Sequence, residues 1–377
     1  MKIHKDQPEG LFDLFDNKSD YSSPNENDEA LVLHTSGTTS RPKIVPLSNN
    51  NIYSSSENIS KSLSLTDNDH CLNIMPLFHI HGLIAVLATS MKVGASVCAS
   101  SGFNALKFLD LARLEKITWY SGVPTMHQAI LLRANKNKEA AKNLNLRLIR
   151  SSSASLPPAV FKDLNESFNC PVIEAYGMTE ATHQMTSNPL PPKQQKAGFV
   201  GLPAGPEVCI MSENGDIMKQ GEEGEVCIKG ENVTLGYENN EEANKTSFTN
   251  GWFRTGDQGY FDEDGYLKIS GRLKEIINKG GEKISPLEVD NVLMDHPSID
   301  QAVCFGYEDK MLGENIASAI IIKSGETCSE EDVLKYAQEK LAKFKIPKKI
   351  FFVDEIPKGA TGKLQRNVLA KKFGLSS

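Results

Sequence analysis

The sequence predicts an α/β protein: a large mixed α/β domain that carries a β-rich subdomain, followed by a small, mobile α+β domain at the C-terminus. Three observations indicate this organisation. Short apolar runs alternate with helix-like stretches as far as about residue 195, as in a mostly parallel sheet. Asn-Gly and Asp-Gly pairs then separate β-rich runs over residues 200–270, as in hairpins. A second alternation of helices and strands begins near residue 271, and 377 residues suit two to three domains of ~150 residues each.

The large domain is expected to span residues 30–272, after a polar lead-in of residues 1–29 that is rich in Asp, Asn and Ser. The apolar runs predict strands at residues 30–34, 71–75, 96–99, 118–121, 146–150 and 172–174. Helices are expected at residues 105–115 and 159–168. Pro157 and Pro158 open the second of them, as proline does in a first helical turn.

The β-rich subdomain is expected at about residues 198–270, with strands such as 225–229 and 266–270. Its turns are predicted at Asn214-Gly215, Asn250-Gly251 and Asp264-Gly265. The C-terminal domain should span residues 273–377, with strands at 301–305, 317–322 and 350–353. Ser285 and Glu288 have capping-box spacing, so a helix should run from there to about residue 296, and Ser329 should open another.

Composition excludes several classes of protein. At 39% apolar and 24% charged residues, the chain is neither disordered nor a membrane protein, and no apolar run reaches the ~20 residues of a membrane span. The net charge of −7 argues against a nucleic-acid binder. Residues 331–377 nevertheless hold 11 basic and 5 acidic side chains, against 30 and 43 before them. This basic segment suits an anionic ligand at one edge or is an ordinary solvated, Lys-rich helix.

Cysteine usage and the two termini predict a cytoplasmic protein. The seven cysteines form no C-x-x-C pair and mostly lie in apolar runs, as expected in a reducing compartment. The first residues have no apolar signal-peptide core, and the chain ends in Gly-Leu-Ser-Ser rather than a peroxisomal tripeptide.

A loop rich in hydroxyl groups directly follows the expected strand at residues 30–34. It reads Thr35-Ser36-Gly37-Thr38-Thr39-Ser40-Arg41-Pro42-Lys43. Backbone N–H groups, hydroxyls and two cations are what a polyphosphate-binding loop needs. It is not a Walker A loop, because no second glycine precedes Lys43 and Ile44 replaces the metal-binding Ser or Thr. Taken alone, such a stretch is more often only a loop.

Three further blocks have the chemistry of a nucleotide site. Tyr176-Gly177-Met178-Thr179-Glu180 follows a predicted strand, at the end where α/β proteins bind ligands, and Glu180 is a candidate Mg²⁺ ligand or simply an acid at a helix start. Asp257 and Arg272 flank a predicted hairpin and can hold a ribose or phosphate. Lys363 lies in a loop between glycines, where its ammonium could stabilise an anionic transition state.

Together these blocks, in this order, resemble the adenylate-forming superfamily of acyl-CoA synthetases, luciferases and peptide-synthetase adenylation domains. The resemblance covers residues 30–372 and is strongest to the oxalate–CoA ligase branch. The segments that indicate this branch are Pro76-Leu77-Phe78-His79-Ile80-His81-Gly82, Ser151-Ser152-Ser153-Ala154-Ser155-Leu156, Thr182-His183 and Ser187-Asn188-Pro189-Leu190-Pro191.

The resemblance implies a ligase that uses ATP, Mg²⁺ and coenzyme A in two steps. A carboxylate attacks the ATP α-phosphate to form an acyl-adenylate; the C-terminal domain then rotates, and the CoA thiol displaces AMP. The resemblance also implies a role for each motif residue. The β,γ-phosphates would be bound by Thr35, Ser36, Gly37, Thr38, Thr39 and Lys43, the α-phosphate by Thr179, Mg²⁺ by Glu180, adenine by Glu174, Ala175 and Tyr176, and the ribose by Asp257 and Arg272. Lys274 would be the hinge between the domains, Lys283 would border the tunnel for the CoA thiol, and Lys363 would be the lysine that acts in adenylation.

The substrate pocket can be argued from side-chain chemistry. Oxalate keeps one carboxylate free after adenylation, so its pocket needs fixed donors, which Ser153 and His183 can supply. Ser153 also belongs with the residues that flank the nucleotide. In the competing interpretation Ser153 is a turn residue and His183 a satisfied core histidine. His79 and His81 are expected to alternate on a strand and so mimic a metal pair; without a third ligand, His81 more plausibly lines the acyl pocket.

Two departures from the family leave alternatives open. Only 34 residues precede Thr35, where family members carry an additional subdomain, so we expect a truncated large domain whose strand at 30–34 lies inside a sheet with an uncovered side. Self-association is expected in consequence. Ile44 also replaces the usual glycine, which would stiffen the loop. The alternatives to an oxalate ligase are a ligase for another short or aromatic acid, such as a coumarate-type acid, and a non-catalytic remnant that binds nucleotide or a partner chain.

Overall fold

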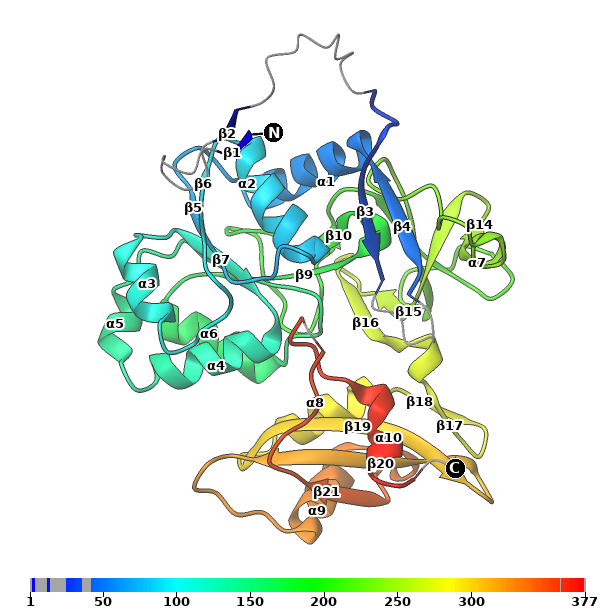
Figure 1. Cartoon of the computed structure of the whole chain (residues 1–377). Coiled ribbons are helices and arrows are strands. Elements are labelled where there is room, and N and C mark those ends of the chain that lie inside the picture. The colour runs from blue at the N-terminus through cyan, green and yellow to red at the C-terminus, as the bar shows by residue number, and fades with distance from the viewer. Residues whose placement is uncertain (1, 4–11, 14–24, 36–41, 360, 376–377) are drawn as a thin grey trace.

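The computed structural model describes residues 2–3, 12–13, 25–35, 42–359 and 361–375 (Figure 1). The large domain with its β-rich subdomain occupies the upper part of Figure 1, and the C-terminal domain lies below it. The helix α10 (Leu369–Lys372) belongs to the C-terminal domain, and the segment that precedes it reaches up to the large domain. The α/β architecture that the sequence predicts is confirmed.

A seven-stranded sheet forms the centre of the large domain. Its order is β11 (Leu202–Pro203), β10 (His183–Ser187), β9 (Val172–Met178), β8 (Leu148–Ser151), β7 (Trp119–Gly122), β5 (His70–Asn73) and β6 (Ser96–Ala99). The strands from β9 to β6 pair in parallel, whereas β10 and β11 are antiparallel. The expected parallel sheet is therefore present, and its carboxyl edge is available for a ligand site.

Helices cover both faces of this sheet because alternate strand residues are apolar on both sides. Trp119 and Leu148 face one core together with α1 (Asn49–Ser62) and the π-helix η1 (His81–Ala88), which continues into α2 (Thr89–Lys92). Tyr120 and Ile149, the next residue on each strand, face the other core. That core also contains residues from the remaining helices, α3 (Phe108–Leu114), α4 (Pro124–Ala134), α5 (Lys138–Lys142) and α6 (Pro158–Phe168).

The strand expected at residues 30–34 forms, but not in the large sheet. It is β3 (Glu29–His34), which pairs antiparallel with β4 (Ile44–Ser48) in a separate two-stranded sheet. The Thr35 N–H donates to the Lys43 carbonyl at 2.9 Å, so the chain returns directly along β3. The expectation that this strand lies inside a sheet is wrong for the described residues, because β3 has a paired strand on one side only.

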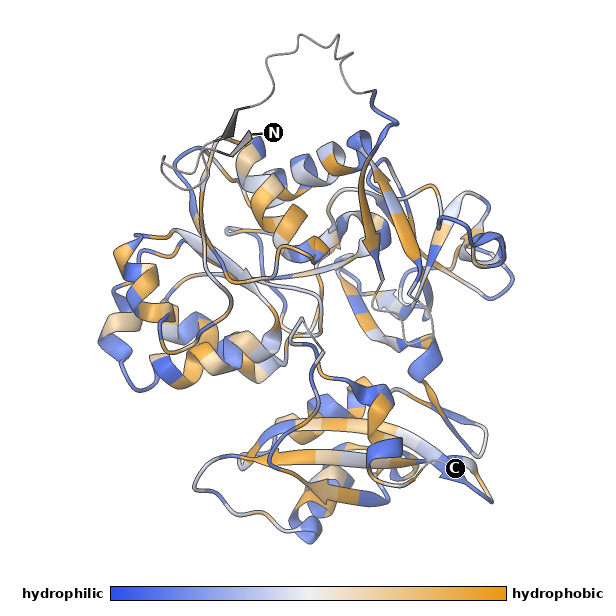
Figure 2. Cartoon of the chain, in the orientation of Figure 1, coloured by the Kyte–Doolittle hydropathy of each residue, from blue (hydrophilic) through white to orange (hydrophobic). Residues whose placement is uncertain are grey.

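The β-rich subdomain and the C-terminal domain each have a sheet of their own. The first contains β12 (Glu207–Met211), β13 (Gly224–Lys229), β14 (Phe248–Thr249), β15 (Trp252–Phe261) and β16 (Leu267–Arg272), with α7 (Glu241–Ser247) alongside. The second contains β17 (Ile277–Lys279), β18 (Glu282–Ile284), β19 (Ile299–Asp309), β20 (Gly313–Ile322) and β21 (Lys349–Phe352), with α8 (Pro286–Met294) and α9 (Glu330–Lys340). Figure 2 shows apolar residues along much of the C-terminal sheet and along η1.

Of the two N-terminal helix caps predicted for the C-terminal domain, one forms and the other does not. Ser329 caps α9 in a complete capping box with Asp332, as expected. Ser285 makes no such bond at the start of α8; its hydroxyl donates instead to the Ser270 carbonyl, and Glu288 pairs with Lys345. Tertiary contacts thus replace the local cap. Among the residues the structure describes, no helix is long and apolar enough to cross a membrane.

Candidate active site

Asp257 and Arg272 form a cross-strand pair directly opposite each other on β15 and β16. Arg272 Nε donates to Asp257 Oδ1 at 2.7 Å, and the Tyr176 hydroxyl donates to Oδ2 at 2.5 Å. Asp257 is buried; its Oδ2 also accepts from Arg272 Nη2 at 3.4 Å, whereas Oδ1 takes a single hydrogen bond and keeps a further lone pair. Burial and then the neighbouring Asp257 charge raise the pKa of Tyr176, so its hydroxyl stays protonated as a donor. The pair can therefore accept hydrogen bonds from adjacent hydroxyl groups.

Glu180 lies just after β9, in the short helix η2 (Thr179–Ala181), and is 6% exposed. Tyr237, which the sequence analysis missed, donates its hydroxyl to Glu180 Oε1 at 2.8 Å. Lys43 Nζ lies 4.1 Å from the centre of the Tyr237 ring, and the Lys43 N–H donates to Thr35 Oγ1 at 3.2 Å. Burial lowers the pKa of Lys43, and the Glu180 charge opposes this. A carboxylate and a cation thus lie together beside the hydroxyl-rich loop.

Thr35 and Lys43 are described, whereas Ser36, Gly37, Thr38 and Thr39 lie outside the described residues. Their predicted role toward phosphates stays a prediction.

Lys363 reaches the large domain from the C-terminal domain. Burial, and then the charge of Arg272, lower its pKa to about 8, although the charges of Asp257 and Glu180 oppose this shift. These influences place the ammonium in one electrostatic environment with residues up to about 180 positions away in the sequence. The loop is held there by the Thr125 hydroxyl, at the start of α4, which donates to the Gly362 carbonyl at 2.9 Å.

His81, Ser153 and His183 come together as the sequence predicts, in a buried polar cluster with two residues that it did not single out. His81 Nδ1 lies 3.0 Å from Ser153 Oγ, and its Nε2 lies 2.6 Å from Ser121 Oγ. Arg150 Nη2 lies 3.4 Å from His183 Nδ1, and the two histidine rings are 5.0 Å apart. Ser153 and His183 have φ of +74° and +97°, a conformation that L-residues rarely adopt and that often marks functional sites.

The expected strand at His79 and His81 is wrong. His81 begins the π-helix η1, and its N–H donates to His79 Nδ1 at 3.2 Å. The helix forms because residues 82–88 are almost all apolar and pack on the sheet. Throughout the part of the chain that the structure describes, no group of three or more His, Cys, Asp or Glu side chains is arranged to hold a metal ion.

Glu174, Ala175 and Thr179 surround this region on β9 and η2. Glu174 is 1% exposed, and its Oε1 accepts from the Leu156 N–H at 2.9 Å. Burial raises its pKa to about 8. The Ala175 carbonyl accepts from Ser152 Oγ at 2.8 Å, and Thr179 is half-buried beside Glu180. Their predicted contacts with adenine and phosphate stay predictions.

Two predicted residues are exposed, although the charge of one of them, Lys274, contributes to lowering the pKa of Lys43. Lys274 is exposed in η3 (Leu273–Glu275), where the β-rich subdomain leads into the C-terminal domain. Lys283 is exposed on β18, with its Nζ 4.0 Å from Glu213 Oε1. In this arrangement of the domains Lys283 does not join the other candidate residues.

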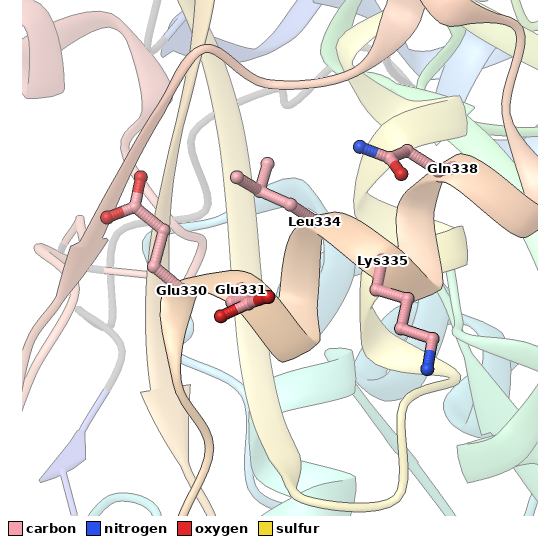
Figure 3. Close-up of a pocket in the computed structure, with 5 residues that line it drawn as sticks. All are labelled: Glu330, Glu331, Leu334, Lys335 and Gln338. Atoms are coloured by element: carbon pink, nitrogen blue, oxygen red, sulfur yellow. The ribbon is translucent and has the colours of Figure 1, made fainter.

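A surface hollow of about 550 Å³ lies elsewhere, on α9. It is lined by Glu330, Glu331, Leu334, Lys335 and Gln338. Figure 3 shows these side chains on one helix, with their polar ends pointing in different directions. They neither converge on a point nor include a candidate residue, so this hollow is no rival to the cluster described above.

Comparisons with known proteins agree with this geometry. Residues 3–238 match the family of AMP-binding enzymes, and residues 288–363 match the AMP-binding enzyme C-terminal domain. The chain is 51% identical over 350 residues to an oxalate–CoA ligase of Arabidopsis thaliana, covering 92% of this chain and 68% of that protein. It is 49% identical over 353 residues to an oxalate–CoA ligase of Saccharomyces cerevisiae, covering 93% and 64%. The chain thus spans about two thirds of the length of these relatives.

Two solved structures are similar over the same extent. ATP-bound MatB from Rhodopseudomonas palustris superposes with a TM-score of 0.87 at 32% identity, over 93% of this chain and 69% of that one. The O-succinylbenzoate coenzyme A synthetase of Bacillus subtilis, in complex with ATP and magnesium ion, superposes with a TM-score of 0.80 at 34% identity, over 91% and 70%.

Proposed function

Since this chain belongs to the AMP-binding enzyme family, we propose that it is an ATP- and Mg²⁺-dependent acid–thiol ligase that converts oxalate and coenzyme A to oxalyl-CoA, AMP and diphosphate. One observation carries the proposal. Lys363, Glu180 and the Asp257–Arg272 pair meet in one electrostatic environment beside a buried, cationic cluster of hydrogen-bond donors.

In the first half-reaction an oxalate oxygen attacks the α-phosphorus of ATP, and the bond to the β-phosphate bridge breaks as pyrophosphate leaves with the electron pair. Asp257 accepts from the ribose hydroxyls, and Arg272 holds Asp257 in place. Lys363 provides positive charge where negative charge develops. Glu180 fits Mg²⁺, which takes one or two carboxylates together with phosphate oxygens and water and would neutralise phosphate charge.

In the second half-reaction the coenzyme A thiol gives its proton to water and its sulfur attacks the acyl carbon; the bond from that carbon to the phosphate oxygen breaks, and AMP leaves with the electron pair. We propose that the C-terminal domain rotates between the steps about the segment that holds Lys274, which removes Lys363 and brings Lys283 toward the site. The exposure of both Lys274 and Lys283 supports this, because neither is tied into a core.

Oxalate is proposed as the acid because the cluster of His81, Ser153 and His183 offers polar donors rather than an apolar tunnel. A second carboxylate would find hydrogen bonds there, whereas an aromatic ring would bury these groups without partners, which costs roughly 1–3 kcal/mol per group.

Pyrophosphate exchange with a panel of acids tests this proposal. The purified 377-residue chain, with ATP and Mg²⁺, should exchange labelled pyrophosphate into ATP with oxalate far faster than with acetate, malonate or 4-coumarate. If exchange is fastest with 4-coumarate, the proposed substrate is an aromatic acid and not oxalate. If no acid supports exchange, the alternative of a non-catalytic protein that binds nucleotide is favoured instead.

We further propose that the protein acts in the cytoplasm and that its copies associate through β3. All seven cysteines, each within the described residues, are unpaired, which supports a reducing compartment. Within the described residues β3 pairs with β4 alone, and its Val32 is 44% exposed, so one strand edge is available to another chain. Light scattering should detect a dimer or larger species that Val32→Lys reduces; a monomeric wild type would contradict this.

A further inference from the structure

We propose that Arg150 is a positioning residue for the acid substrate: its buried charge fixes the tautomers of His81 and His183 so that His183 Nε2 and, through His81, the Ser153 hydroxyl each present a donor to the free carboxylate of the substrate. The inference rests on the proposed function for the identity of the acid, but the tautomers can be measured without any acid.

Arg150 lacks the partner that a buried guanidinium normally has. It lies on β8, is fully buried, and makes no ion pair with any described residue. Its neighbours are neutral: Ser121 Oγ at 3.4 Å from Nη1, and Gln184 Oε1 at 3.1 Å and His183 Nδ1 at 3.4 Å from Nη2. Its Nε has no partner. Buried charges are normally paired, so an anion is the missing partner.

A second arginine of the same segment shows the contrast. Arg147 binds Asp69 through both Nε and Nη2, at 2.7 and 2.9 Å, and so has its counter-ion within the protein. Arg147 is partly exposed, whereas Arg150 is not. The unpaired charge is therefore a property of position 150 and not of the arginines of this segment in general.

The tautomer of His183 follows from its contact with Arg150. A guanidinium has donors only, so His183 Nδ1 accepts from Nη2. The proton of the neutral imidazole must then lie on Nε2, and this atom is buried without a partner. Burial, and then the Arg150 charge, lower the pKa of His183 well below its usual value, so the ring is neutral. His183 consequently presents one fixed N–H donor.

The same reasoning extends through Ser121 to His81. Ser121 Oγ accepts a hydrogen bond from Arg150 Nη1. The hydroxyl proton of Ser121 is thereby directed toward His81 Nε2, which lies 2.6 Å from Ser121 Oγ. The His81 proton then lies on Nδ1 and is donated to Ser153 Oγ at 3.0 Å. This leaves the Ser153 O–H as the second free donor. One cation thus sets both ends of the relay, and the ligand that fits is a small acid with a second carboxylate.

The first test observes the tautomers directly. Long-range ¹H–¹⁵N NMR of the wild-type chain with ¹⁵N-labelled histidine should show His183 protonated at Nε2 and His81 at Nδ1. The signals are assigned by their loss in His183→Asn and His81→Asn. Arg150→Met should turn both rings into tautomer mixtures, and Arg147→Met should leave them unchanged. Protonation of His183 at Nδ1 in the wild type would overturn the proposal.

The second test separates positioning from structural support. Arg150→Met should raise the KM for oxalate on the order of tenfold or more while kcat in pyrophosphate exchange changes less than threefold, and Arg150→Lys should recover part of the loss. Arg147→Met should lower thermal stability without changing this KM. An oxalate KM within twofold of wild type in Arg150→Met, or equal losses for oxalate and acetate, would overturn the proposal.

The two proposals fail in different ways. If the wild type shows no oxalate-dependent exchange, the proposed function fails, while the tautomers still decide the role of Arg150. If Arg150→Met does not fold, Arg150→Lys and the wild-type tautomers decide it instead. A wild type that favours oxalate and has the opposite tautomers contradicts the role of Arg150 alone.

Discussion

Glu180 is a buried carboxylate that accepts a hydrogen bond from one tyrosine hydroxyl. A substitution that removes only this hydroxyl oxygen tests the role of the contact. Tyr237→Phe removes the donor at 2.8 Å from Glu180 Oε1. Because the carboxylate then loses its fixed orientation, we expect the Mg²⁺ concentration needed for half-maximal pyrophosphate exchange to rise roughly three- to tenfold. Tyr266→Phe is the matched control, since that hydroxyl donates to the Gln194 carbonyl instead. Equal Mg²⁺ curves for the two variants would contradict the role of Tyr237.

Lys363 predicts a pH dependence of the first half-reaction. Its pKa in the folded protein is lowered from 10.5 to about 8, so the ammonium is complete well below pH 8 and is lost as pH rises through 8. The rate constant kcat/KM for pyrophosphate exchange reports the free enzyme and should fall over the same range. Lys363→Arg, whose charge persists, should give a flatter profile at a lower rate. Identical pH profiles for the wild type and Lys363→Arg would show that another group causes the fall in kcat/KM at high pH.

At the scale of single residues, the sequence identifies functional residues that lie in short motifs and misses those whose contact partners are distant in the sequence. Glu180 is visible because Tyr176 and Thr179 precede it, whereas Tyr237 lies 57 residues away from it, between Gly236 and Glu238, in a stretch without a recognisable motif. Arg150 could have been noticed as a charged residue that follows Leu148 and Ile149 in a predicted strand. Its lack of a counter-ion, however, is a property of the folded protein alone.

At the scale of elements, the loop that carries Lys363 depends on one helix of the other domain. The Thr125 hydroxyl at the start of α4 donates to the Gly362 carbonyl at 2.9 Å. Thr125→Val removes this bond at nearly constant volume, so pyrophosphate exchange should fall severalfold while thioester formation from supplied acyl-adenylate is retained. Thr125→Ser keeps the hydroxyl and should behave as wild type. If Thr125→Val lowers both half-reactions alike, the contact serves stability and not the docked loop.

Element prediction succeeds where periodicity and caps are local and fails where tertiary contacts decide. The parallel strands and the Ser329 cap follow from short sequence patterns. His81 was expected on a strand, but the apolar residues after it build a helix against the sheet. Ser285 has the spacing of a cap, yet its hydroxyl is taken by Ser270 on β16. In both cases a partner distant in sequence determines the local structure.

At the scale of the whole molecule, the two domains have separate apolar cores and meet through polar contacts. The core of the large domain and that of the C-terminal domain share no residue. Between the domains, Thr125 contacts Gly362, and Gln128 Nε2 lies 3.5 Å from the Asp300 carbonyl. Polar contacts of this kind between domains permit their relative motion. The sequence indicates two such units from its motifs, but which faces meet is visible only in the structure.

The half-reactions of Lys363→Ala, measured separately beside the wild type, test the central claim most directly. The wild type should exchange pyrophosphate with oxalate and form oxalyl-CoA. The variant should lose the exchange almost completely, because the ammonium serves only the first transition state, yet should convert supplied oxalyl-adenylate and coenzyme A to the thioester at a rate close to that of the wild type. Equal losses in both half-reactions would contradict a site that is completed by Lys363 for adenylation and rebuilt without it for thioester formation.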